Sequence, residues 1–272
     1  MSFDDVPGRA RREIVDSFDA RAAGYANNQW HRRCAERLVG LCRLGQGLRV
    51  LDAATGTGFA ALAASTVVGP EGHVVGVDLS PGMLREARAA VAQAQRTNVE
   101  LVEGDVVDLP QYSSGSFDVV TCAAGLLYLP VAEALREWHR LLVPDGIVAF
   151  SSMRAGSPRA GQLFRNCAAA YGVTLQDPSE PVGSVDACTQ VLEDAGFEPI
   201  RIATETIEFT PADLRCAWES NLGSAGHGAV WQLGAAELAS FERQYRETIE
   251  REARDNPHLL GQAGILYAIG RR

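Results

Sequence analysis

Apolar and polar positions along this chain follow two periods, one typical of helices and one typical of buried strands. Residues 9–23 and 31–44 carry apolar side chains three or four positions apart, as one face of a helix does. From residue 48 onward, short continuous apolar runs alternate with longer helical patterns. The chain is therefore predicted to begin with two helices and then to alternate strands with helices.

Seven short runs rich in aliphatic residues are predicted to be strands, because turn residues bound each of them. Strand and helix in regular alternation predict an α/β fold, Rossmann-like and doubly wound, with a mostly parallel seven-stranded sheet and helical cap insertions. The long connection before the last strand predicts that this strand is antiparallel. The predicted strands are 48–54, 72–79, 99–106, 117–124, 146–153, 197–210 and 264–272, and the predicted helices between them are 59–68, 80–95, 131–143, 185–196 and 235–256.

The stretch "VLDAATGTGFAALAAS", residues 50–65, sets a strand against a glycine-rich turn and then a helix. Gly56 and Gly58 carry no side chain, so backbone N–H groups and the positive end of the helix dipole can approach a polar ligand. Asp78 ends the next predicted strand, about 20 residues on, where an acid can accept hydrogen bonds from both hydroxyls of a ribose. These features indicate a nucleoside. They leave adenosylmethionine and a nicotinamide or flavin ligand open, because "GTGFAA" also matches G-x-G-x-x-A.

Composition narrows the chemistry further. The chain has 46% hydrophobic and 22% charged residues, which is typical of a globular protein, and its net charge of -9 without a long basic run argues against nucleic acid as a partner. It contains no lysine, which excludes a pyridoxal Schiff base, a phosphate-loop lysine and the Tyr-x-x-x-Lys pair of short-chain reductases.

Cysteine spacing and hydropathy predict no metal site and no membrane insertion. The six cysteines form no C-x-x-C pair, so neither a zinc site nor a redox motif is indicated. The first residues lack an apolar signal core, and no apolar run reaches the length of a membrane span. We expect a cytoplasmic protein.

Four motifs in order resemble those of the class I S-adenosylmethionine-dependent methyltransferases: "VLDAATGTG", "VVGVDLSPGML", "VEGDVVDLP" and "FDVVTCAAGLLYLP". The resemblance covers about residues 40 to 150. The segment "LREWHRLLVPDGIVAFSS" is similar to the subgroup related to the menaquinone and ubiquinone biosynthesis methyltransferases. This resemblance implies S-adenosyl-L-methionine as the cofactor. Two positions depart from the family pattern, since Ala54 and Asp145 stand where glycines are common. We expect the extra methyl group of Ala54 to be tolerated with a negative φ.

The resemblance also implies roles for the cofactor-binding residues. Backbone from Ala54 to Gly58 would lie against the methionine part and the ribose, and Asp52 would help to fix the amino group. Asp78 would accept from the ribose hydroxyls, Asp105 from the exocyclic amine of adenine. The complete set is Asp52, Ala54, Thr55, Gly56, Gly58, Asp78, Leu79 and Met83 beside the adenine, Gly104, Asp105, Val106, and Ala123 at the sulfonium end.

Three residues are candidates for catalysis. Tyr25 lies in a stretch similar to the N-terminal lid of the subgroup, where a tyrosine closes over the cofactor. A hydroxyl acceptor would be helped by a base, whereas an enol-type carbon or an amine needs little assistance. His31 and His227 are the candidate bases, and for both the alternative is an ordinary surface or structural histidine.

We therefore expect a methyltransferase that acts on an O, N or C nucleophile of a small, hydrophobic, ring-containing metabolite. The predicted parts are a helical lid at 1–45, a cofactor-binding core at 46–153, and a remainder at 154–272 with cap insertions at 154–185 and 211–258. Two alternatives stay open: an NAD(P)-dependent oxidoreductase, and an S-adenosylmethionine-binding protein with a non-methylating role. The sequence leaves monomer and homodimer equally open.

Overall fold

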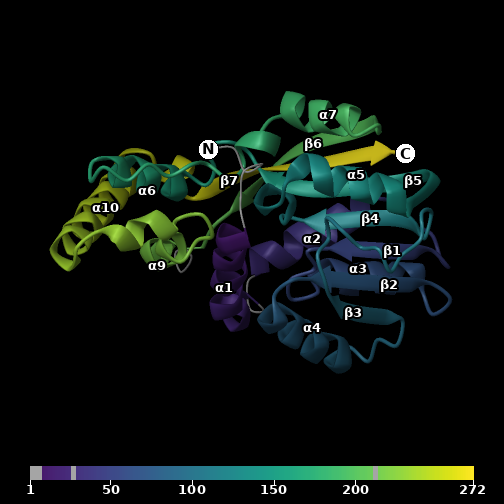
Figure 1. Ribbon diagram of the computed structural model, residues 1–272. Helices are drawn as coiled ribbons and strands as arrows, with labels where there is room; N and C mark the ends of the chain where they lie inside the picture. Colours follow the sequence, from purple (N-terminus) through teal and green to yellow (C-terminus); the bar gives the residue numbers. More distant parts are fainter. Residues whose placement is uncertain (1–7, 26–28, 211–213) are drawn as a thin grey trace.

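The computed structural model describes residues 8–25, 29–210 and 214–272. Strands and helices alternate along the chain as the periodicity predicts (Figure 1). The strands are β1 (Arg49–Ala53), β2 (His73–Asp78), β3 (Val99–Glu103), β4 (Phe117–Ala123), β5 (Leu142–Met153), β6 (Glu198–Glu208) and β7 (Gln262–Arg271). The helices are α1 (Gly8–Tyr25), α2 (Gln29–Leu41), α3 (Phe59–Val68), α4 (Pro81–Gln93), α5 (Val131–Leu141), α6 (Arg159–Ala169), α7 (Val185–Asp194), α9 (Ala217–Leu222), α10 (Ala235–Asp255) and α11 (Pro257–Leu260), with 3-10 turns η2 (Leu126–Tyr128), η3 (Glu180–Val182) and η4 (Gly228–Gln232).

The seven strands form one sheet in the order β3-β2-β1-β4-β5-β7-β6. Strands β1 to β5 pair in parallel, and β7 is antiparallel to both of its neighbours, β5 and β6. The prediction of a doubly wound, mostly parallel sheet with an antiparallel last strand is confirmed. The order reverses between β1 and β4, which leaves a crevice at the carboxyl ends of these two strands.

Neighbouring residues of β1 show how the sheet is covered on both faces. Val50 belongs to an apolar cluster with residues of α2 and α3, whereas Leu51 belongs to the cluster on the other face, which includes residues of α5. Successive side chains of a strand point to opposite faces, so a strand buried on both sides is apolar at nearly every position. Trp138 of α5 is fully buried in the second layer, and its indole N–H donates to the Val106 carbonyl at 2.9 Å.

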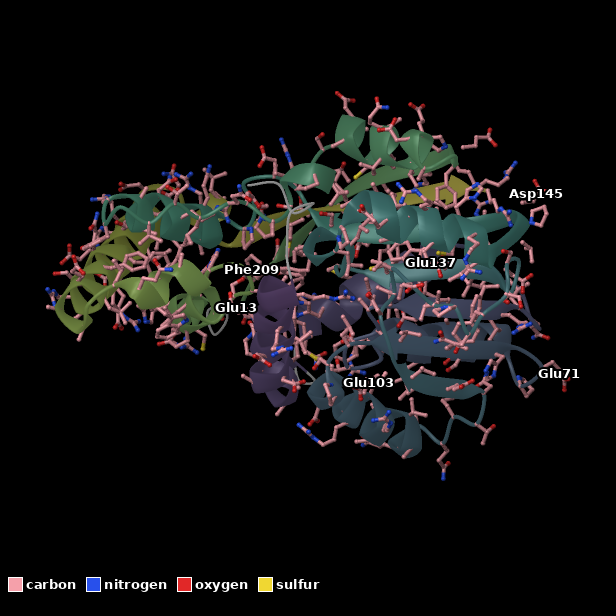
Figure 2. The ribbon with its side chains drawn as sticks, in the orientation of Figure 1. Glu13, Glu71, Glu103, Glu137, Asp145 and Phe209 are labelled. Carbon is pink, nitrogen blue, oxygen red and sulfur yellow. The ribbon has the colours of Figure 1, made fainter. Side chains whose placement is uncertain are left out.

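The end of α5 differs from the sequence prediction. The helix ends at Leu141, and β5 already begins at Leu142, so the segment around Pro144 lies inside an irregular strand. Asp145, one of the two departures from the glycine pattern, has a φ of 63° there. Figure 2 places Asp145 at the end of the sheet opposite the helical lobe, so its backbone conformation bears on the fold and not on the crevice.

Helices from both predicted cap insertions pack on each other beside the sheet (Figure 1). Phe164 of α6 is fully buried and lies 4.8 Å from Phe241 of α10 between ring centroids. An ion pair of 2.7 Å joins Arg159 and Glu252 of the same two helices. We call this lobe of α6, α9, η4 and α10 the cap. Helix α1 lies next to it, and the Ser17 hydroxyl donates to the carbonyl of Gly223 at 2.8 Å.

Candidate functional site

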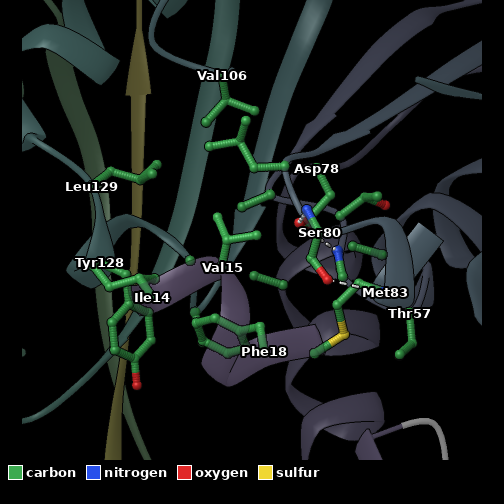
Figure 3. A pocket seen from close by; sticks show the side chains of 18 of the residues that line it. Ile14, Val15, Phe18, Thr57, Asp78, Ser80, Met83, Val106, Tyr128 and Leu129 are labelled. Carbon is green, nitrogen blue, oxygen red and sulfur yellow. Dashed lines mark hydrogen bonds between the residues drawn. The ribbon is translucent and has the colours of Figure 1, made fainter. Parts of the chain in front are cut away.

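A cavity of about 360 Å³ opens at the carboxyl ends of the parallel strands, where the order of the strands reverses. Small-molecule sites of open α/β sheets lie at this place and have volumes of this size. Its wall comes from the loop after β1, from the ends of β2, β3 and β4, and from α1, α2 and η2. Figure 3 shows Phe18 of α1 between Tyr128 and Ser80.

The loop after β1 turns sharply at the floor of the cavity. The Thr55 N–H donates to the Val77 carbonyl at 2.9 Å, which ties the loop to the end of β2. Gly56 and Gly58 have φ of 55° and 84°, the left-handed region that glycine adopts without steric cost. Ala54 has a φ of 52°, so the prediction of a negative φ for this residue is wrong. The backbone of Ala54 follows the path that a glycine would take, because the hydrogen bond from the Thr55 N–H to the Val77 carbonyl of β2 fixes the turn.

Replacing Ala54 by glycine should stabilise the protein. A left-handed conformation costs an L-residue about 1 kcal/mol, and glycine removes this cost. We expect Ala54→Gly to raise the free energy of unfolding in a urea titration by about 1 kcal/mol. The matched change Ala53→Gly, in the strand one residue earlier, should lower it. A loss of stability in Ala54→Gly as large as that in Ala53→Gly would contradict this account.

Asp78 at the end of β2 lines the cavity and holds two parts of its wall. One carboxylate oxygen accepts from the Gly56 N–H at 2.8 Å and the other from the Ser80 N–H at 2.9 Å. Burial raises the pKa of Asp78, and these backbone donors lower it again. The carboxylate thus fixes both the glycine turn and the start of α4 while its remaining lone pairs face the cavity.

Asp52 lies beneath the loop and is not among the residues that line the cavity, and its contact with the cofactor's amino group stays a prediction. It is 1% exposed and accepts from the hydroxyls of Thr55 at 2.6 Å and Thr121 at 2.9 Å. Burial raises the pKa of Asp52 to about 6, although both hydroxyls favour the charged form. The carboxylate therefore supports the loop from below.

The raised pKa of Asp52 predicts a pH dependence of stability. Between the unfolded value of about 4 and the folded value of about 6, the folded protein binds more protons than the unfolded chain. The stability contributed by Asp52 is complete below pH 4 and is lost as the pH rises through 6, by about 2 to 3 kcal/mol. The free energy of unfolding of Asp52→Asn, relative to the unmodified protein, should rise by that amount from pH 4 to 7. If the difference in the free energy of unfolding between Asp52→Asn and the unmodified protein did not change with pH, the raised pKa of Asp52 would be contradicted.

The ends of β2 and β3 form one side of the cavity. Leu79, Met83, Gly104 and Val106 line it there, together with Asp105. The Asp105 carboxylate forms an ion pair with the guanidinium of Arg11, which reaches over from α1. The acid that is predicted to bind adenine is therefore also a point at which α1 is attached to the core.

A second contact attaches α1 on the same side. Asp19 accepts from the Gly82 N–H at 2.8 Å and from the Ser80 hydroxyl, at the first turn of α4. Gly58 lies away from the cavity, because a Cβ there would come within 3.3 Å of the Ala87 methyl group. Its contribution is close packing of the loop on α4.

Aromatic side chains enclose the opposite side of the cavity. Phe18 and Tyr25 come from α1, His31 from α2 and Tyr128 from η2, and Ala123 ends β4 beside them. The ring centroids of Phe18 and Tyr128 are 5.2 Å apart, and those of Tyr25 and His31 are 4.3 Å apart. The structure therefore brings the candidates Tyr25 and His31 together at this wall.

The titratable groups of this wall are uncharged at neutral pH. Burial lowers the pKa of His31 to about 3, with a smaller contribution from the nearby Arg21. Burial raises the pKa of the hydroxyls of Tyr25 and Tyr128. An imidazole with so low a pKa accepts a proton poorly, which argues against His31 as a strong general base.

His227 lies in the core of the cap and is not among the residues that line the cavity, so its contact with the substrate stays a prediction. It is 3% exposed, stacks on Phe164 at 5.2 Å between ring centroids, and its Nδ1 lies 2.7 Å from the Asn221 carbonyl oxygen. The glycine-rich loop that carries His227 packs into the apolar cluster of the cap.

Several lining residues escaped the sequence reasoning. Arg11, Tyr128 and Thr57 line the cavity but were not among the predicted site residues. Arg11 belongs to no residue pattern that indicates a ligand. Tyr128 lies in the fourth motif just after β4, and this position at a strand end was the available signal. Thr57 lies in the glycine turn, for which only backbone contacts were predicted.

The residues present fit S-adenosylmethionine. Asp78 offers a carboxylate at the end of β2, as a nucleoside site requires, beside a turn that has little side-chain bulk. The buried Thr57 hydroxyl has no hydrogen-bond partner among the residues that the structure describes, so a ligand in the cavity could supply one. Within the described ranges, no group of three or more His, Cys, Asp or Glu could hold a metal ion, and no helix is long and apolar enough to cross a bilayer.

Comparison with known proteins adds family evidence to this geometry. A family model described as a methyltransferase domain matches residues 50–146. The demethylmenaquinone methyltransferase of Listeria welshimeri is 31% identical over 206 residues, which are 70% of this chain and 86% of that protein. The structure of a SAM-dependent methyltransferase from Aquifex aeolicus has a TM-score of 0.55 at 22% identity, covering 68% of this chain and 91% of that one. The [4+2]-cyclase SpnF has a TM-score of 0.56 at 19% identity, over 89% and 80% of the two chains.

Proposed function

This chain belongs to the S-adenosylmethionine-dependent methyltransferase family that includes the demethylmenaquinone methyltransferases, and on that premise we propose that its acceptor is a small, hydrophobic, ring-containing metabolite. The observation that carries the proposal is the aromatic wall of Phe18, Tyr25, His31 and Tyr128 at one side of the cavity. The curated relative is named for a quinone. The alternative of an NAD(P)-dependent oxidoreductase is set aside, because the family that matches transfers methyl groups.

When bound, S-adenosylmethionine supplies a methyl group activated on a sulfonium sulfur. We propose that the Asp78 carboxylate accepts from the ribose hydroxyls and that Leu79, Met83 and Val106 cover the adenine. In this proposal Asp105 accepts from the adenine amine, and backbone from Ala54 to Gly58 lies against the methionine part. Apart from Gly58, which packs on α4, these residues line the cavity, and this supports the arrangement.

The aromatic side of the cavity lies beside Ala123, where the resemblance expects the reacting end of the cofactor. Flat apolar side chains can hold a ring by stacking and edge contacts, at ring-centroid distances like those within the wall itself. Methyl transfer requires the acceptor atom in line with the methyl group and shielded from water. Tyr25 and His31 would position the acceptor, and neither needs to carry a charge to do so.

Release of S-adenosylhomocysteine with a panel of acceptors tests the proposal. The panel should contain ring hydroxyls, quinols and aromatic amines, with aliphatic alcohols and amines of similar size as matched controls. We expect turnover with one or more of the aromatic acceptors and none with the aliphatic ones. Binding of S-adenosylmethionine without turnover of any acceptor would favour the non-methylating alternative, and turnover restricted to aliphatic acceptors would contradict the proposed acceptor class.

A further inference from the structure

Arg21 of α1 lies directly behind the aromatic wall. Its guanidinium carbon is 5.0 Å from the ring centroid of Phe18 and 5.9 Å from that of Tyr25. The Arg21 side chain is half-buried on the face of α1 that meets the cap, where its Cδ comes near Gly223. The side chain of Phe18 thus separates the guanidinium from the space that the acceptor would fill.

The partners of Arg21 differ from those of three other half-buried arginines. Arg140, Arg159 and Arg165 are each paired with a carboxylate at 2.7 Å or less. Arg21 donates instead to two neutral oxygens of Ser17, the carbonyl at 3.0 Å and the hydroxyl at 3.1 Å. No carboxylate of the described residues lies within ion-pair distance of it. Its positive charge is therefore not cancelled locally by an acid.

The charge of Arg21 reaches groups on several elements around the wall. It lowers the pKa of Tyr25 on its own helix, of His31 on α2, of Tyr128 on η2, and of His227 before η4, in each case as a smaller cause than burial. The first three of these groups line the cavity. A partly buried cation acts strongly over such distances because little water screens it.

Other charged groups near this wall are already engaged. Asp177 lies near enough to Tyr128 to raise its pKa, yet it pairs with Arg165 at 2.7 Å. On α1 itself, Asp19 is turned toward the first turn of α4, and Glu13 lies beside Gly228 of the cap. Glu133 of α5 lines the same cavity as a further charge, and Arg21 is the cation that lowers the pKa of Tyr25, His31 and Tyr128.

We propose that Arg21 selects an acceptor with an acidic ring hydroxyl and holds it as its anion. This inference rests on the proposed function, and it narrows the acceptor to a phenol or enol that ionises near neutral pH. Such an anion has no proton to lose when its oxygen takes up the methyl group. The site then needs no general base, in agreement with an aromatic wall whose own groups are uncharged. Arg21 is a positioning residue here, because Phe18 stands between it and the cavity.

A spectrophotometric titration of a bound probe tests this selection. The probe is 2-hydroxy-1,4-naphthoquinone, whose ionised form absorbs visible light, bound to the full chain with saturating S-adenosylhomocysteine. In the unmodified protein we expect the pKa of the bound probe to lie about one unit below that of the free probe, which corresponds to about tenfold tighter binding of the anion. Binding of 1-naphthol, which stays protonated at neutral pH, should not gain from the cation.

Three variants separate charge from structure. Arg21→Gln should abolish the shift of the probe's pKa, while Arg21→Lys, which keeps the charge, should retain most of it. Arg12→Gln, which removes an exposed arginine from the same helix, should behave as the unmodified protein. Binding of S-adenosylhomocysteine reports whether each variant is folded.

An unchanged shift in Arg21→Gln would overturn the inference, and so would a failure of the probe to bind the unmodified protein. The proposed function is judged separately, by release of S-adenosylhomocysteine. Turnover of a neutral aromatic amine, with no preference for the anionic probe, would leave methyl transfer to a ring acceptor standing and would remove the role of Arg21.

Discussion

Asp78→Ala is expected to weaken binding of S-adenosylhomocysteine by at least about 100-fold. A hydrogen bond to a charged group contributes about 1.5 to 3 kcal/mol, and the variant loses those that we propose to the ribose. It also releases the N–H groups of Gly56 and Ser80, which the carboxylate holds at 2.8 and 2.9 Å. The glycine turn and the start of α4 then lose their common partner. Isothermal titration calorimetry measures the dissociation constant directly.

Asp118→Ala is the matched control for this change. Asp118 also accepts from a backbone N–H, that of Arg49 at 2.7 Å, but it lies at the opposite ends of the strands from the cavity. We expect its affinity for S-adenosylhomocysteine to equal that of the unmodified protein. Equal affinities for all three proteins would show that Asp78 has no part in holding the nucleoside.

Trp138→Ala is expected to lower the free energy of unfolding by about 3 to 5 kcal/mol, because it leaves a large cavity in a packed layer. Trp138 is fully buried between the sheet and α5, and its indole N–H donates to the Val106 carbonyl at 2.9 Å. The variant leaves that carbonyl without its donor, and Val106 lines the ligand cavity. Urea unfolding followed by circular dichroism gives the change in stability.

Trp231→Ala serves as the comparison within the same protein. Trp231 is 61% exposed on η4, so we expect its removal to change stability by about 0.5 kcal/mol or less. Similar losses for both tryptophans would be inconsistent with the burial described for Trp138.

Sequence periodicity predicted the sheet well, because local patterns determine which segments are strands and which faces they bury. The seven predicted strands all occur, and the last is antiparallel. The junction of α5 and β5 was misplaced, since the predicted helix 131–143 and the predicted strand 146–153 left residues 144 and 145 as a separate turn. In the structure these residues lie inside β5, which pairs irregularly with β4.

The site was less predictable where a side chain's role depends on a partner from another strand or lobe. Asp52 faces away from the cavity because Thr121, on the adjacent β4, donates to it. Ala54 takes a positive φ because the following N–H is tied to β2. His227 is buried by packing between α6 and its own loop, which no local pattern reveals. No sequence pattern indicates Arg21, since its proposed role depends on having no acid of the described residues within ion-pair distance.

A crystal structure of this chain with S-adenosylhomocysteine is the most direct measurement of the central claim, which is that the crevice between β1 and β4 holds the methyl donor with its reacting end at the aromatic wall. The account predicts ribose hydroxyls within hydrogen-bond distance of Asp78, adenine between Met83 and Val106, and the sulfur on the side of Ala123 and Tyr25. A ligand whose sulfur points to the side of Asp105, or one bound outside this cavity, would contradict it.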